Sequence, residues 1–106
     1  MAPRKDDDFF EKIELAVCSL TRESLSIKDR VLESALEVST FIGTKYQPED
    51  QKIRDLWNGT VNSLTSGGHV QKTVTAMDQP KLSEIEDSFK RLHQLAKAWK
   101  EETHND

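Results

Sequence analysis

The chain has 106 residues, of which 32% are charged and 35% apolar, and its formal net charge at pH 7 is −4. A chain of this length suits one domain and needs no disulfide or metal to bury a core. Its acidic balance gives no general attraction to nucleic acid or to anionic membranes. No apolar stretch approaches the roughly 20 residues that cross a bilayer, and no apolar signal core follows the first basic residues. We therefore expect a cytoplasmic protein without a membrane association.

A first helix is expected over residues 8–20, after a loose tail at residues 1–6. Its apolar side chains recur every third or fourth residue, which is the spacing of one helix face: Phe9, Ile13, Ala16, Val17 and Leu20. The acidic run from Asp6 to Asp8 favours capping of the helix start. Binding of a cation or of a basic partner by the same carboxylates is the alternative.

A second helix is expected over residues 27–46, because Ser26 to Asp29 resembles a capping box with Asp in place of Glu. Its apolar stripe is wide for a surface helix, which predicts a central helix that touches neighbours on two sides. Phe41 should be a core anchor. The stripe comprises Ile27, Val31, Leu32, Ala35, Leu36, Val38, Phe41, Ile42 and Tyr46.

Pro48 is expected to end the second helix and to open a third, over residues 48–65, because proline is tolerated in a first turn. Trp57 is the anchor of the third stripe. Gly59 weakens this helix by about 1 kcal/mol relative to Ala. It predicts either a kink or close helix crossing, or an early helix end at Asn58-Gly59.

The glycines of Ser66-Gly67-Gly68 mark the clearest break in the chain. A short fourth helix is expected after it, over residues 69–77, and Asp78-Gln79-Pro80 is the next break. A fifth helix is expected over residues 81–102, followed by a tail at 103–106. The sequence thus predicts one all-α domain over residues 1–106, a small bundle of four to five helices.

The fifth helix carries the most regular pattern, with apolar spacings that alternate between three and four residues as in a heptad seam. The seam covers only about two and a half heptads, fewer than a true coiled coil needs, which favours packing on the chain's own bundle. A dimer or partner seam is the alternative. Its interaction residues would be Leu82, Ile85, Phe89, Leu92 and Trp99.

Groups for catalysis or metal binding are few and scattered. A zinc site needs three or four ligands, commonly in close pairs, whereas Cys18 stands alone and His69, His93 and His104 are far apart in the sequence. Cys18, beside Val17, is interpreted as a small buried hydrophobic residue; pairing with a distant His in a hydrolase is the alternative. No phosphate-binding glycine motif follows a strand, and Glu-x-x-His occurs once, from Glu101 to His104, whereas a di-iron site needs it on facing helices. We assign no catalytic, metal or cofactor-binding residue and expect no enzymatic activity.

Cations concentrate only on the last helix, where Lys90, Arg91, Lys97 and Lys100 accompany Trp99. Cations beside an aromatic residue can contact a nucleic-acid backbone. Acidic neighbours interrupt the group, however, and cations late in a helix also stabilise its negative end. The expected function is therefore a protein–protein interaction or regulatory module that binds a protein partner or a second copy of itself. A nucleic-acid-associated regulator is the alternative.

Residues 38–57 have a recognisable order: aliphatic residues end a helix, Pro48 and acidic residues follow, and the next helix carries Asp55-Leu56-Trp57. This order resembles a family of small, uncharacterised helical proteins from Gram-positive, spore-forming bacteria. The resemblance extends over residues 27–79, and residues 69–77 resemble the family's final helix. It implies a helical fold and a bacterial cytosolic setting, and it transfers no activity and no catalytic residue.

Overall fold

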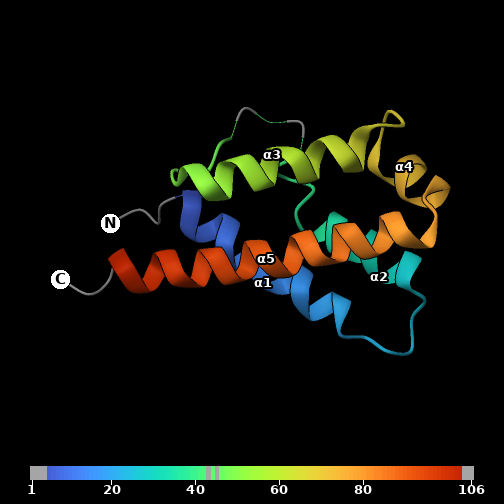
Figure 1. The fold of residues 1–106 in the computed structure, drawn as a ribbon, viewed down its shortest axis with the longest axis horizontal. Helices are drawn as coiled ribbons and strands as arrows, with labels where there is room; N and C mark the ends of the chain where they lie inside the picture. Colours follow the sequence, from blue (N-terminus) through green and yellow to red (C-terminus); the bar gives the residue numbers. More distant parts are fainter. Residues whose placement is uncertain (1–4, 43, 45, 104–106) are drawn as a thin grey trace.

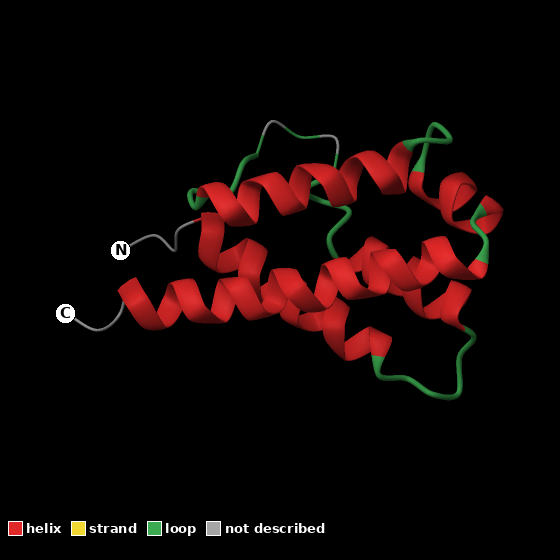
Figure 2. Ribbon diagram, viewed as in Figure 1, coloured by secondary structure: helices red, strands yellow, loops and turns green. Residues whose placement is uncertain are grey.

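A computed structural model describes residues 5–42, 44 and 46–103, and these residues form five α-helices without a strand (Figures 1 and 2). The all-α bundle expected from the sequence is confirmed. In chain order the helices are α1 (Lys5–Leu20), α2 (Ile27–Glu37), α3 (Gln51–Thr65), α4 (Val70–Ala76) and α5 (Gln79–Thr103).

The long helix α5 organises the bundle. It contacts α1, α2 and α3, and Figure 1 shows it running opposite to α3 and crossing α1. The start of α1 and the end of α5 lie at the same end of the molecule (Figure 1). Helix α2 contacts α1, α4 and α5, as expected for a helix that touches neighbours on two sides, but Leu36 of its predicted stripe is exposed. All five helices contribute side chains to one buried cluster.

Aromatic side chains fill the end of the core near the start of α1. Phe9 lies at their centre, with ring centroids 4.8 Å from Trp57, 5.3 Å from Phe41 and 5.2 Å from Tyr46. The contacts with Phe41 and Trp57 are edge-on, an arrangement that aromatic quadrupoles favour. Trp57 and Phe41 are both buried, which confirms them as core anchors.

Helix α2 ends at Glu37, nine residues before the expected end at Tyr46. From Val38 to Ile42 the backbone forms successive turns, in which Phe41 N–H donates to the Val38 carbonyl and Ile42 N–H to the Ser39 carbonyl. Val38, Ser39 and Thr40 are poor helix formers, because β-branching and hydroxyl groups compete with the helix. The turns bring Phe41 onto Phe9, a long-range contact that apolar periodicity does not reveal.

Helix α3 begins at Gln51 rather than at Pro48, because Asp50 is its N-cap: the Asp50 carboxylate accepts from Ile53 N–H at 3.1 Å. Pro48 is fully buried just before it, and its carbonyl accepts from Arg54 Nε at 3.1 Å. The early end at Asn58-Gly59 is wrong, since the helix runs on to Thr65. A close crossing at Gly59 is also wrong, because a Cβ built there meets nothing within 4 Å.

Side-chain caps also set the starts of α2 and α5. Ser26 accepts from Asp29 N–H at 3.2 Å, which confirms the cap predicted for α2. Helix α5 begins two residues earlier than expected, because Asp78 accepts from Lys81 N–H at 3.1 Å and Pro80 is tolerated in the first turn. Helix α1 begins at Lys5, so the acidic run lies within its first turn and the expected tail is shorter. Residues 1–4 and 104–106 lie outside the described residues.

The break between α3 and α4 is confirmed at the predicted glycines. Gly68 has a φ of +112°, which L side chains rarely adopt, so glycine is required there. Gly67 N–H donates to Thr73 Oγ1 at 2.9 Å, and that hydroxyl donates to the His69 carbonyl at 2.8 Å. Within the described part of the chain, no helix has the length and apolar character that spanning a bilayer requires.

Candidate functional site

The predicted seam of the last helix lies inside the bundle. Leu82, Ile85, Phe89 and Leu92 are at most 3% exposed, and Trp99 is half-buried against Phe10 at 5.4 Å between ring centroids. These side chains therefore fill the chain's own core, which is the intramolecular packing that the short seam favours. A folded second copy has no access to the four buried side chains.

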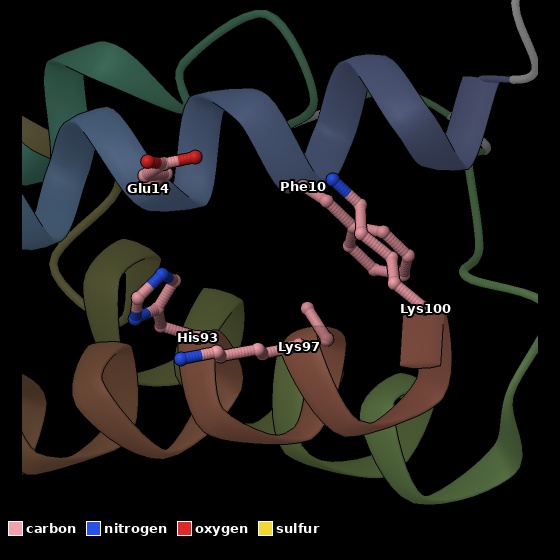
Figure 3. A pocket seen from close by; sticks show the side chains of 6 residues that line it. Phe10, Glu14, His93, Lys97 and Lys100 are labelled. Atoms are coloured by element: carbon pink, nitrogen blue, oxygen red, sulfur yellow. The ribbon is translucent and has the colours of Figure 1, made fainter. Parts of the chain in front are cut away.

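An open groove lies beside this seam, between α1 and α5 (Figure 3). Its volume is about 300 Å³, and we call it the α1–α5 groove. Two residues of α1 and four of α5 line it: Phe10, Glu14, His93, Ala96, Lys97 and Lys100.

The floor of the α1–α5 groove is apolar. Phe10 and Ala96 are each 3% exposed, so most of their surface is used in the core and only a strip faces the groove. The Lys100 ammonium lies 5.6 Å from the centroid of the Phe10 ring, within the range of a cation–π interaction. The edge of the core thereby positions a cation at one end of the groove.

The walls of the α1–α5 groove carry the charges. His93, Lys97 and Lys100 are spaced by four and three residues, which places them on one side of α5. Figure 3 shows Glu14 and His93 at one end of the groove and Phe10 and Lys100 at the other, with the Lys97 side chain extending toward His93. Each end of the groove thus has a lysine, and Glu14 is the single carboxylate among the lining side chains.

Some cations of α5 form ion pairs within the helix, and others line the groove. Lys90 is paired with Glu86 at 3.2 Å, and Lys81 with Glu84 at 3.4 Å, so these charges stabilise the helix surface itself. Among the described residues, neither Lys97 nor Glu14 makes an ion pair within 4.0 Å. The basic concentration seen in the sequence is therefore not one patch: Lys97 and Lys100 belong to the groove, and Lys90 does not.

The groups weighed for metal or nucleophilic chemistry do not converge. Across the described residues there is no cluster of three or more His, Cys, Asp or Glu side chains that suits a metal ion. His69 is occupied as the N-cap of α4, where Nδ1 accepts from Lys72 N–H at 3.4 Å. Cys18 is exposed on α1, so its interpretation as a buried hydrophobic residue is wrong. His104 lies outside the described residues.

A second, smaller hollow of about 210 Å³ lies where the α3–α4 turn meets the start of α5. It includes Gly67 and Thr73. The Gly67 N–H donates to Thr73 Oγ1, and this hydroxyl donates to the His69 carbonyl. This hollow is therefore explained by the structure of the turn.

The sequence identifies Lys97 and Lys100 as candidate cations, but it does not identify Phe10, Glu14, His93 and Ala96 as their neighbours. One signal was present: Phe10, Ile13 and Val17 follow the three- and four-residue spacing of a second apolar strip on α1. Nothing local indicates that this strip meets α5.

Comparison with known proteins adds no relative: no protein family, curated protein or solved structure matches this chain. The resemblance of residues 27–79 to the family from spore-forming bacteria stays a prediction.

Proposed function

We propose that this chain is a protein–protein interaction module and that the α1–α5 groove is its binding surface. The observation that carries the proposal is the combination in one groove of an apolar floor, from Phe10 and Ala96, with Lys97 and Glu14 on its walls, neither of which makes an ion pair with another described residue. Protein-binding surfaces combine apolar contact with a polar rim in this way. Charged side chains at the rim of such a surface steer a complementary partner toward it and set the register in which the partner binds.

The dimensions of the groove suit a segment of a partner protein. The lining residues of α5 run from His93 to Lys100, and at 1.5 Å per residue this is about 10 Å along the helix. That length accommodates about two turns of a docked helix or about three residues of extended peptide. Docking of a short segment between two helices is a common mode of peptide recognition.

Self-association stays a prediction, and the burial of the α5 seam limits how it could occur. A dimer that used Leu82, Ile85, Phe89 or Leu92 would first have to separate α5 from α1 and α3, since these side chains are in the core. A dimer of folded copies would need another surface, and the α1–α5 groove offers both apolar and charged groups.

The test is crosslinked affinity capture from the native cell with three forms of the chain: the parent, Lys97→Glu and Arg91→Glu. Lys97 and Arg91 are both exposed on α5, and both substitutions change the net charge equally, but only Lys97 lines the groove. We expect at least one protein, or the chain itself, to be crosslinked to the parent and to Arg91→Glu and to be lost with Lys97→Glu. Capture of the same set by all three forms, or of nothing by the parent, would contradict the proposal.

A further inference from the structure

We propose that the occupant of the α1–α5 groove is an acidic peptide segment of a partner, with one large apolar side chain flanked by carboxylates. This inference rests on the proposed function and specifies its partner's chemistry. It follows from three features of the groove: the sign of its charges, their positions at its two ends, and the apolar surface of Phe10 and Ala96.

The sign of the charges favours an anionic ligand. Two lysines and one carboxylate line the groove, although the whole chain has a net charge of −4. The groove is therefore a locally cationic site on an acidic protein. An acidic segment gains attraction there, while the acidic remainder of the surface disfavours its binding elsewhere.

The positions of the charges give the segment its pattern. Lys100 lies at the Phe10 end, and Lys97 extends toward the His93 end (Figure 3). Ala96 lies between His93 and Lys100 on α5, so two carboxylates of a ligand would flank an apolar side chain that lies on Ala96 and the adjoining edge of Phe10. Glu14 is an acceptor in the same groove, and it is matched by an N–H donor such as a tryptophan indole.

The expected affinity is modest, which decides how binding should be measured. Exposed ion pairs contribute little individually, and the apolar strip is narrow because Phe10 and Ala96 are almost fully buried. We therefore expect a dissociation constant of about 0.1–1 mM, with strong dependence on salt. Exchange at this affinity is well suited to chemical-shift titration of the full chain.

The experiment titrates the ¹⁵N-labelled full chain with a capped peptide that has two Glu residues on either side of a central Trp. Matched peptides carry Gln in place of every Glu, or Ala in place of Trp. We expect shifts confined to amides of residues 10–14 and 93–100, and affinity about tenfold higher for the Glu peptide than for the Gln peptide. The preference should fade between about 0.01 M and about 1 M salt, and the Ala peptide should bind more weakly.

Variants and a competing ligand make the outcome decisive. Lys97→Glu should abolish the preference for the Glu peptide and Arg91→Glu should retain it, with circular dichroism showing that both are folded. Equal binding of the Glu and Gln peptides, shifts outside the groove, or stronger shifts in the groove with duplex DNA would overturn the inference. If captured partners depend on Lys97 but the Glu peptide shows no preference, the interaction function stands and the acidic chemistry is wrong. If neither depends on Lys97, both proposals fail.

Discussion

The ring of Phe9 on α1 meets the indole of Trp57 on α3 edge-on, with 4.8 Å between the ring centroids and a 73° angle between their planes. Both side chains are at most 1% exposed. The contact joins the first helix to the third across 48 residues of sequence, and Phe41 and Tyr46 pack on the same Phe9 ring. Phe9 therefore packs against segments that are distant from it in the sequence.

Phe9→Ala is expected to destabilise the fold by about 3–5 kcal/mol, through lost burial and the cavity left among the aromatic rings. That is a large share of the about 5–15 kcal/mol typical of a domain. The milder Phe9→Leu should lower the free energy of unfolding by about 1.5 kcal/mol or less. Urea unfolding followed by tryptophan fluorescence and by circular dichroism measures both. Leu36→Ala is the control, because Leu36 is 56% exposed; a Phe9→Ala effect as small as that of the control would contradict the packing.

Phe89→Asp is expected to leave the chain largely unfolded, because Phe89 is fully buried and an unpaired carboxylate in its place loses its hydration. If Phe89 served only a seam between copies, the same substitution would give a folded monomer. Circular dichroism separates these outcomes. The milder Phe89→Leu should lower stability by about 1.5 kcal/mol or less without changing the association state. Sedimentation over a range of concentrations checks the second point.

Substitution of Gly68 and of Gly59 by alanine is expected to change the stability of the fold in opposite directions. Gly68→Ala should cost about 1–3 kcal/mol, because its φ of +112° is strained for any residue with a Cβ. Gly59→Ala should stabilise by about 0.5–1 kcal/mol, since Gly59 is exposed inside α3 and an added Cβ meets nothing within 4 Å. Paired urea midpoints measure both changes. Destabilisation by Gly59→Ala would show that α3 is closely approached at this point.

Cys18 is expected to react in the native state, because its side chain is exposed on α1. Its alkylation rate in the folded chain should lie within about tenfold of the rate in urea, since the exposed side chain is accessible to the reagent in both states. Mass spectrometry of samples quenched over time gives both rates, and Cys18→Ser supplies the blank. Labelling that occurs only after unfolding would restore the buried interpretation of this residue.

The boundaries of the helices show how far local pattern reaches. Ser26 was recognised as a cap from its neighbours alone, because the side chain bonds an amide only three residues away. The end of α2 was missed, because apolar periodicity continues through Val38, Phe41 and Ile42 while the backbone turns. Those side chains are apolar for another reason: Val38 and Phe41 belong to the core, and Ile42 packs against it, after the helix has ended.

The sequence identifies some of the residues of the candidate site. Lys97 and Lys100 stood out as a concentration of charge on one helix, but charge alone did not separate them from Lys90, whose partner Glu86 lies one turn away. Phe10 and Glu14 are about 80 residues distant in the chain and join the site only where α1 crosses α5. No pattern within either segment specifies that crossing.

The sequence by itself determined that this chain forms helices, where each begins to within three residues, and that glycine interrupts them at Gly67-Gly68. Those features depend on apolar spacing, caps and backbone conformations within a few residues of one another. The tertiary structure decided which apolar faces of the helices pack against one another. It placed the α5 seam in the core rather than at an interface, ended α2 early over Phe9, exposed Cys18, and formed the α1–α5 groove. These outcomes depend on packing between distant segments, which close-packed side chains decide together rather than one by one.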